Sequence, residues 1–328
     1  MQRVFVTRQI FRGAIDRIPS EVEVESWQQD SPPPLDVLFE KAAQVEGLLT
    51  LLTDPINTSV IEAGAANRLK VISQMAVGFD NIDIKTATEK GIPVGNTPGV
   101  LTETTADFAW SLLMAAARRV VEGHNEVQRC IWRPWGPNVL CGADVYGSTL
   151  GLIGFGRIGQ AMARRARGFN MRVLYTQRHR DLKAEAELGA EYMPLDQLLS
   201  ASDFVSLHAY LSPEAKGMIG AQQFALMKPG AVFINTARGA MVDHEALHQA
   251  LLSGRIAAAA LDVFDPEPAP ASHPTLSLPQ VIITPHIASA STPTRQRMAF
   301  MAVENLLAGL EGKPLPFCAN PQVYESNL

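Results

Sequence analysis

The stretch of sequence that decides the fold is VYGSTLGLIGFGRIGQ, which covers residues 145–160. An apolar run leads into the pattern G-x-G-x-x-G, formed by Gly154, Gly156 and Gly159, and a helical run follows. The first glycine allows a tight turn, the second lets the backbone approach a pyrophosphate, and the third lets the helix pack closely on the strand. The helix N-terminus adds free N–H groups that favour phosphate. The stretch therefore predicts a dinucleotide-binding unit rather than a simple glycine-rich turn.

The composition narrows the class of protein. The chain has 328 residues, of which 47% are hydrophobic and 19% charged, with a net charge of −5. This length and composition predict two globular domains. No run of five basic residues occurs and no apolar stretch is long enough for a membrane span or a leader peptide, so we expect no nucleic-acid or membrane partner and a cytoplasmic location. The three cysteines, Cys130, Cys141 and Cys318, are too scattered for a disulfide framework, and no cluster at ligand spacing predicts a metal site.

Short apolar runs alternate with helical stretches on both sides of the glycine pattern. Before it, we predict strands at 4–6, 22–24, 47–52, 71–73 and 93–95, and helices at 35–45, 58–66 and 84–90. After it, we predict six strands at 150–153, 172–175, 204–207, 232–235, 257–261 and 281–284, and helices at 160–169, 195–201, 221–227 and 244–253. Alternation of this kind predicts an α/β protein with two Rossmann-like, doubly wound parallel-sheet domains.

Two long helices complete the predicted organisation. One runs from about residue 102 to 129, with Arg118 and Arg119 in its middle. The other, residues 294–312, has no place in a finished six-stranded unit, so we expect it to return to the first domain. The dinucleotide-binding domain, residues 101–287, would then be inserted into a discontinuous substrate domain made of residues 1–100 and 288–328.

Three ionisable side chains follow predicted strands of the second domain. Arg238 lies in NTARG, Glu267 in LDVFDPEP and His286 in TPHIASA. Taken singly, these are more often a surface cation, a solvated acid and a loop histidine. Ligands of open α/β sheets bind beyond the carboxyl ends of the strands, so we expect the three side chains to converge on one crevice. Together they form the candidate catalytic set.

Several segments resemble the signatures of the D-isomer-specific 2-hydroxyacid dehydrogenase family. They are residues 151–159, 235–239, 261–268 and 285–290, together with VGFDNID at 77–83. Within the family, NTPGVLTE at 96–103 and Leu207-His208 resemble the glyoxylate and hydroxypyruvate reductase branch, which includes 2-ketogluconate reductases. The resemblance implies a homodimeric enzyme that reduces a small 2-keto acid, glyoxylate or hydroxypyruvate first, with NAD(P)H.

The resemblance assigns roles to single residues. Arg238, Glu267 and His286 match the family's catalytic residues, while Val77 and Gly78 match its carboxylate-binding backbone loop, which binds substrate together with Arg238. These residue types suit the chemistry. A planar guanidinium can hold a carboxylate and polarise the carbonyl beside it. An imidazole can give a proton to the developing alkoxide, and a carboxylate on its other nitrogen stabilises the imidazolium.

The strand after the glycine turn indicates which cofactor is used. It ends VLYTQRHR at 173–180, without the acid that usually binds the ribose 2′-hydroxyl of NAD. Arg178, with Arg180 as a second cation and Thr176 as a further donor, would suit a 2′-phosphate, so we predict NADP(H) in preference to NAD(H), with NAD(H) still usable. A solvated basic turn is the alternative. The predicted cofactor-binding residues are Thr104, Gly154, Phe155, Gly156, Arg157, Ile158, Gly159, Gln177, Arg178, His179, Thr236, Ala237, Arg238, Asp262 (beside the nicotinamide amide), His286 and Ala288.

Other interpretations remain open from sequence alone. One is a non-enzymatic, dinucleotide-sensing protein similar to the corepressors of this family, which the intact Arg238, Glu267 and His286 set disfavours. Another is a phosphite, formate or D-lactate dehydrogenase. Trp132 and Trp135 either pack between domains or subunits or form a wall of the substrate pocket. We expect the 102–129 helix and residues 133–146 in the dimer interface.

Overall fold

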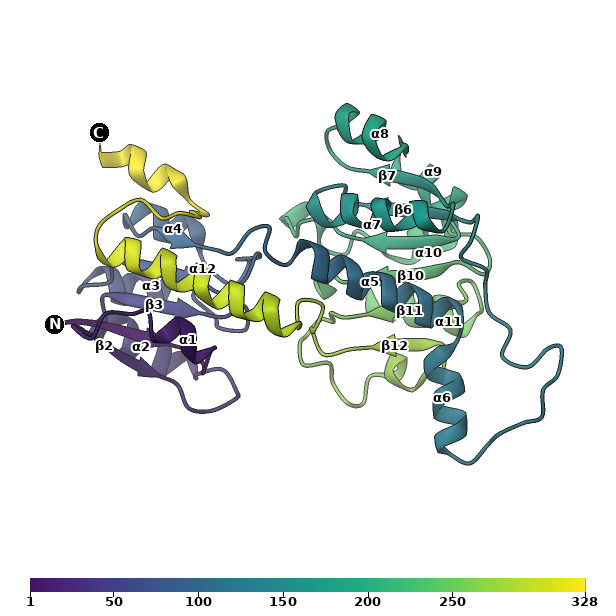
Figure 1. Ribbon diagram of the computed structural model, residues 1–328, viewed down its shortest axis with the longest axis horizontal. Coiled ribbons are helices and arrows are strands. Elements are labelled where there is room, and N and C mark those ends of the chain that lie inside the picture. Colours follow the sequence, from purple (N-terminus) through teal and green to yellow (C-terminus); the bar gives the residue numbers. More distant parts are fainter. Residues whose placement is uncertain (328) are drawn as a thin grey trace. The chain divides into compact units, whose positions relative to one another are not determined.

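The chain folds into two compact units, seen in a computed structural model that describes residues 1–327. The first unit holds Met1–Leu101 and the segment from Ala290 onward, and the second holds Thr102–Ser289. The chain therefore leaves the first unit once, builds the second and returns (Figure 1).

The first unit is built on five parallel strands in the order β2-β1-β3-β4-β5. They are β1 (Gln2–Val6), β2 (Val22–Ser26), β3 (Gly47–Thr50), β4 (Val71–Gln74) and β5 (Val94–Gly95). All side chains of β3 and β4 are buried, as expected of a parallel sheet covered on both faces. The covering helices are α1 (Arg12–Ile15) and α12 (Thr292–Leu310) in one hydrophobic cluster, and α2 (Leu35–Gln44), α3 (Thr58–Ala65) and α4 (Ile84–Glu89) in another.

The second unit is built on seven parallel strands in the order β12-β11-β10-β9-β6-β7-β8. They are β6 (Thr149–Ile153), β7 (Arg172–Thr176), β8 (Ala190–Tyr192), β9 (Phe204–Leu207), β10 (Val232–Asn235), β11 (Ala258–Leu261) and β12 (Val281–Ile283). One cluster of the core contains α5 (Thr102–Ala117) and α7 (Arg157–Gly168), and the other contains α9 (Leu195–Ala201), α10 (Ala221–Leu226) and α11 (His244–Leu252). The order reverses next to β6, so the glycine turn lies where ligands of such sheets bind.

The sequence missed one strand of this sheet. The structure has a seventh strand, β8, preceded by α8 (Leu182–Leu188), where six strands were predicted. β8 is three residues long and only Ala190 in it is buried, so it lacks the apolar run that marks the other strands. Backbone pairing with β7 and the ion pair between Arg172 and Glu191 hold it at the sheet edge.

The predicted helix at 102–129 is also wrong, because the structure breaks it at Arg118–Arg119. α5 ends at Ala117 and α6 (Val120–Gln128) begins after Arg119, whose φ of 52° is left-handed. The carbonyl of Ala117 accepts a hydrogen bond from the N–H of Ala143 at 2.8 Å, which replaces a bond within the helix. The guanidinium of Arg119 binds Glu122 in the first turn of α6. The break therefore depends on a segment more than twenty residues away.

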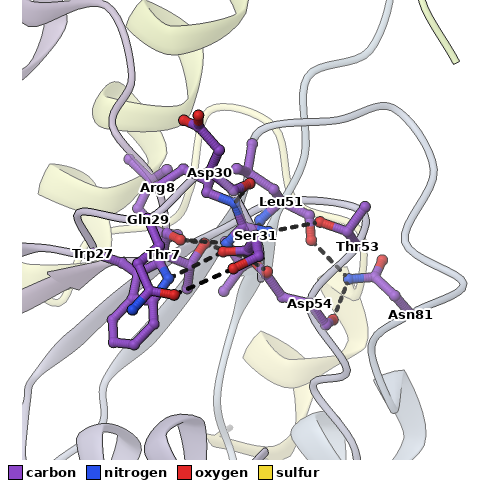
Figure 2. A network of polar contacts seen from close by, with 12 residues as sticks. Thr7, Arg8, Trp27, Gln29, Asp30, Ser31, Leu51, Thr53, Asp54 and Asn81 are labelled. Atoms are coloured by element: carbon purple, nitrogen blue, oxygen red, sulfur yellow. Dashed lines mark hydrogen bonds and ion pairs between the residues drawn. The ribbon is translucent and has the colours of Figure 1, made fainter. Parts of the chain in front are cut away.

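A buried ionic network closes the carboxyl edge of the first sheet (Figure 2). Asp54 is fully buried and accepts hydrogen bonds from Thr7 Oγ1 at 2.5 Å and from the N–H of Leu51 at 2.7 Å. Arg8 Nη1 lies 3.3 Å from its other oxygen. Burial raises the pKa of Asp54 despite these hydrogen bonds and the charge of Arg8. Arg8 also lines a hollow of about 530 Å³ in this unit.

We predict that Asp54→Ala destabilises the protein by about 3 kcal/mol or more in the free energy of unfolding, because it leaves a buried guanidinium and two donors without their acceptor. Chemical denaturation measures the change. Glu89→Gln is the matched control, since the Lys85–Glu89 pair is exposed and 3.9 Å apart, and it should cost about 0.5 kcal/mol or less. Equal effects of the two substitutions would contradict a structural role for the network.

Candidate active site

The glycine turn follows β6 and has the shape that a dinucleotide phosphate requires. Gly154 has a φ of +94°, and a Cβ there would lie 2.6 Å from the backbone of His208 and Ala209. A Cβ on Gly159 would lie 2.3 Å from the carbonyl oxygen of Gly154. A Cβ on Gly156, by contrast, would meet no atom within 4 Å beyond its neighbours in the chain, and α7 begins at the next residue. An open backbone next to a helix N-terminus fits a pyrophosphate.

Two side chains from neighbouring strands flank this turn. Gln177, after β7, accepts a hydrogen bond from the N–H of Phe155 at 3.3 Å and donates to the carbonyl of His179 at 2.6 Å. His208, after β9, has Nε2 2.8 Å from Ser206 Oγ. Burial lowers the pKa of His208 to about 4, so it is neutral near pH 7. Gln177 thus holds the turn through an uncharged contact, whereas the neutral His208 ring bonds to its own strand.

Arg238 is presented by a turn after β10. The buried side chain of Asn235 accepts from the N–H of Ala237 and donates to the carbonyl of Arg238, each at 2.9 Å. Thr236 is buried inside this turn, and Arg238 Nη1 donates to the carbonyl of Ala237 at 2.8 Å. An amide at the strand end therefore fixes the backbone from which the guanidinium extends.

Glu267 and His286, which follow neighbouring strands, form a hydrogen-bonded pair. His286 Nδ1 lies 2.8 Å from Glu267 Oε2, and the N–H of Phe264 donates to Glu267 Oε1 at 3.1 Å. Burial favours a higher pKa for Glu267, but the hydrogen bond and charge of His286, the Phe264 N–H and the charge of Arg238 outweigh it, and the pKa is lowered. The charge of Arg238 therefore reaches Glu267.

Asp262 holds the loop that carries His286. Its carboxylate is 1% exposed and accepts hydrogen bonds from Thr284 Oγ1 at 2.6 Å, the N–H of Ile287 at 2.9 Å and the N–H of Ala288 at 2.7 Å. The carbonyl of Asp262 accepts from the N–H of His286 at 2.9 Å. His286 has a φ of 55°, which costs free energy in a residue other than glycine. The sequence predicts Asp262 beside the cofactor and carries no signal for this role.

Packing joins the Arg238 turn to the Glu267 loop. A Cβ on Gly239 would lie 2.0 Å from the carbonyl carbon of Phe264, so the two segments are in direct backbone contact. The ring of His244 stacks on Phe264 with centroids 3.8 Å apart. Burial and the nearby charge of His273 lower the pKa of His244. This contact between distant segments of the chain had no signal in the sequence.

Two further groups of predicted residues belong to other elements. Val77 and Gly78 follow β4 in the first unit, and their carbonyls accept hydrogen bonds from Asn96 Nδ2 at 2.9 Å and Gln74 Nε2 at 3.3 Å. The side-chain amides of Asn96 and Gln74 thus fix the peptide planes at 77–78.

Thr104, a predicted cofactor-binding residue, lies in the first turn of α5.

The basic turn after β7 separates the two arginines that the sequence grouped together. Arg178 Nη2 contacts Ser212 Oγ at 3.2 Å and Glu214 Oε2 at 3.1 Å. Arg180 instead donates to both oxygens of Glu185, in α8, at 3.0 and 2.8 Å. Arg178 is therefore the cation of this turn that faces the loop after β9, and the second predicted cation is paired elsewhere.

Two negative findings concern the part of the chain that the structure describes. Among residues 1–327, no group of three or more His, Cys, Asp or Glu side chains is placed to hold a metal ion. Over the same residues, no helix combines the length and the apolar character needed to cross a bilayer.

The comparisons with known proteins all indicate the same family. Residues 110–288 match the sequence model of the D-isomer specific 2-hydroxyacid dehydrogenase NAD binding domain. A glyoxylate reductase of Korarchaeum cryptofilum is 51% identical over 324 residues, 98% of this chain and 97% of that protein. A glyoxylate reductase of Aeropyrum pernix is 47% identical, over 98% of this chain and 97% of that protein.

Solved structures agree with the sequence comparison. The TT0316 protein of Thermus thermophilus is similar with a TM-score of 0.90 and 45% identity, over 97% of this chain and 99% of that one. The NADPH-dependent glyoxylate/hydroxypyruvate reductase of Sinorhizobium meliloti, solved with NADP and malonate, is similar with a TM-score of 0.83 and 30% identity, over 98% of each chain.

We predict that Asp262→Asn lowers kcat on the order of 10²-fold and the free energy of unfolding by about 1–3 kcal/mol, because an amide cannot accept from both Ile287 and Ala288 as the carboxylate does. Steady-state kinetics and denaturation of the same samples measure both. Asp265→Asn, an exposed change in the adjoining loop, is the control. A variant of unchanged stability that lost only cofactor affinity would instead assign Asp262 to cofactor binding alone.

Proposed function

The chain belongs to the D-isomer specific 2-hydroxyacid dehydrogenases, and we propose that it reduces glyoxylate or hydroxypyruvate to the corresponding 2-hydroxy acid. The observation that carries the proposal is the His286–Glu267 pair, 2.8 Å apart and within the influence of Arg238, in a unit whose glycine turn fits a dinucleotide. The names of the relatives from Korarchaeum cryptofilum and Sinorhizobium meliloti support these two substrates.

Each of the three side chains has a separate task in this proposal. Arg238 binds the substrate carboxylate and polarises the keto oxygen, because its planar fork matches both acceptors. His286 gives the proton that the developing alkoxide needs, through the ring nitrogen that Glu267 does not bind. Glu267 stays ionised because its pKa is lowered, and it fixes the imidazole ring. A bound reduced nicotinamide supplies the hydride.

The remaining predicted residues complete the proposal. The N–H groups of Val77 and Gly78 bind the substrate carboxylate, on peptide planes fixed by Asn96 and Gln74. The glycine turn binds the pyrophosphate. Arg178 binds a 2′-phosphate, so the protein prefers NADPH and still uses NADH, because no acid stands at the end of β7 to reject the phosphate. The NADP bound to the Sinorhizobium meliloti structure supports this choice.

The protein is a homodimer in this proposal. Large apolar side chains are exposed throughout α6 and the segment that follows it, with Ile131 49%, Trp132 81%, Trp135 90% and Tyr146 71% exposed. Exposed apolar side chains in such number mark an interaction surface. A second copy is the partner that the family resemblance implies, with the predicted interface at residues 102–129 and 133–146.

We predict that His286→Asn retains cofactor binding and loses about 10²–10⁴-fold in kcat/KM for glyoxylate, because the positioned proton donor is gone. A substrate panel of glyoxylate, hydroxypyruvate, pyruvate and 2-ketogluconate with both reduced cofactors tests the substrate class. Full turnover by His286→Asn, or no activity of the wild type on any 2-keto acid, would overturn the proposed function.

The matched variant Glu267→Gln tests whether Glu267 contributes to the proton step that His286 performs. The carboxylate of Glu267 keeps its effect on the pair at every pH above its lowered pKa and loses it as the pH falls through that value. The loss of kcat/KM in Glu267→Gln relative to the wild type should therefore be full at neutral and alkaline pH and shrink in acid. A profile that overlays the wild type would separate Glu267 from the proton step.

We predict a mass of about 71 kDa in solution, twice 35.6 kDa. The double variant Trp132→Ser, Trp135→Ser should shift the population toward the monomer, because it removes the two most exposed aromatic side chains of the segment. Analytical ultracentrifugation at micromolar concentration measures this. Leu252→Ser, at a side chain 63% exposed on α11, is the control. A monomeric wild type would refute the dimer.

A further inference from the structure

An ion pair already occupies the cation that the 2′-phosphate would use. Arg178 Nη2 lies 3.1 Å from Glu214 Oε2, and Ser212 Oγ donates to that same oxygen at 2.7 Å. Glu214 belongs to a single 3₁₀ turn, Pro213–Ala215, in the loop after β9. The carboxylate is therefore oriented by its own loop and does not depend on Arg178 for its position.

The topology places this pair across the cofactor turn. β6 lies between β7 and β9 in the sheet, Arg178 follows β7, and Glu214 follows β9. The glycine turn follows β6 at the same edge. An ion pair that joins the two flanking loops at this edge lies where the adenosine end of a dinucleotide binds in such sheets.

Arg180, the second arginine of the segment, is paired with a different acid. Arg180 is held by both oxygens of Glu185, and its guanidinium lies 5.4 Å from the centroid of Tyr192. Arg178 is thus the guanidinium of the 173–180 segment whose partner can be exchanged for a ligand. Its partner Glu214 is as exposed as Arg178 itself, each 73%, so the pair is weak and exchangeable.

We propose that Glu214 is a specificity-determining residue that competes with the 2′-phosphate of NADPH for Arg178 and so moderates the preference for NADPH over NADH. The inference rests on the proposed phosphate site at Arg178. A phosphate monoester carries close to two negative charges and accepts bidentate hydrogen bonds, so it displaces the single carboxylate oxygen. The neutral 2′-hydroxyl of NADH gains nothing by displacing it, so the ion pair survives when NADH binds.

Direct binding measures this competition without turnover. Dissociation constants of NADPH, NADH, 2′,5′-ADP and 5′-ADP are determined by calorimetry for the wild type, Glu214→Gln, Arg178→Ala and the double variant. Glu214→Gln should tighten NADPH and 2′,5′-ADP about two- to fivefold, the range that an exposed ion pair can contribute, and leave NADH and 5′-ADP unchanged. Glu187→Gln is the control, since Glu187 is an exposed acid on α8 that pairs with Lys183.

The four proteins separate the possible failures. Unchanged NADPH binding in Arg178→Ala would overturn the proposed phosphate site itself. Weaker NADPH binding in Arg178→Ala, together with unchanged NADPH binding in Glu214→Gln, would overturn the competition alone. In the Arg178→Ala background the Glu214→Gln change should have no effect, and a persisting gain there would show direct repulsion of the phosphate and refute competition for Arg178. Equal tightening of NADPH and NADH binding in Glu214→Gln would refute the specificity role. Tighter NADPH binding in the control Glu187→Gln would refute it as well.

Discussion

The carboxylate of Asp262 is the interaction on which the candidate site depends. It is buried at the end of β11 and takes three hydrogen bonds from the loop after β12, so two adjacent strand ends become one rigid edge. His286 has a left-handed backbone in the loop that these hydrogen bonds hold, which offsets its conformational cost. The imidazole then reaches Glu267 without any adjustment of its own backbone. In the proposed reaction, an imidazole placed in this way does not have to be oriented again.

Packing extends this rigid edge to the neighbouring strand. Gly239 lies against the backbone of Phe264, and Phe264 in turn donates its N–H to Glu267. The turn that carries Arg238 and the loop that carries Glu267 are therefore joined by direct contact. His244 completes the contact from α11 by stacking on Phe264, and burial keeps this ring neutral near pH 7 because it lowers the pKa. The proposed division of tasks among three side chains rests on a scaffold that fixes all three together.

The cofactor edge is built on a different principle. Around the glycine turn the contacts are close and uncharged, which suits the proposed approach of the backbone to a pyrophosphate. At its rim the contacts are exposed ion pairs such as that of Arg178 with Glu214, which exchange easily. A rigid centre with an exchangeable rim would let a fold of this family change its cofactor preference by substitutions that leave the catalytic residues untouched.

Local pattern in the chain was enough to predict most strands and helices to within a few residues, the dinucleotide turn, and the strand-end positions of Arg238, Glu267 and His286. The folded chain settled what depends on distant partners: the helix break at Arg119 follows from Ala143, and the edge strand β8 from pairing with β7. The same holds for Asp262, whose role comes from N–H groups more than twenty residues away. Hydrogen bonds and ion pairs of this kind leave no periodic trace in a sequence, because their geometry exists only after the chain has folded.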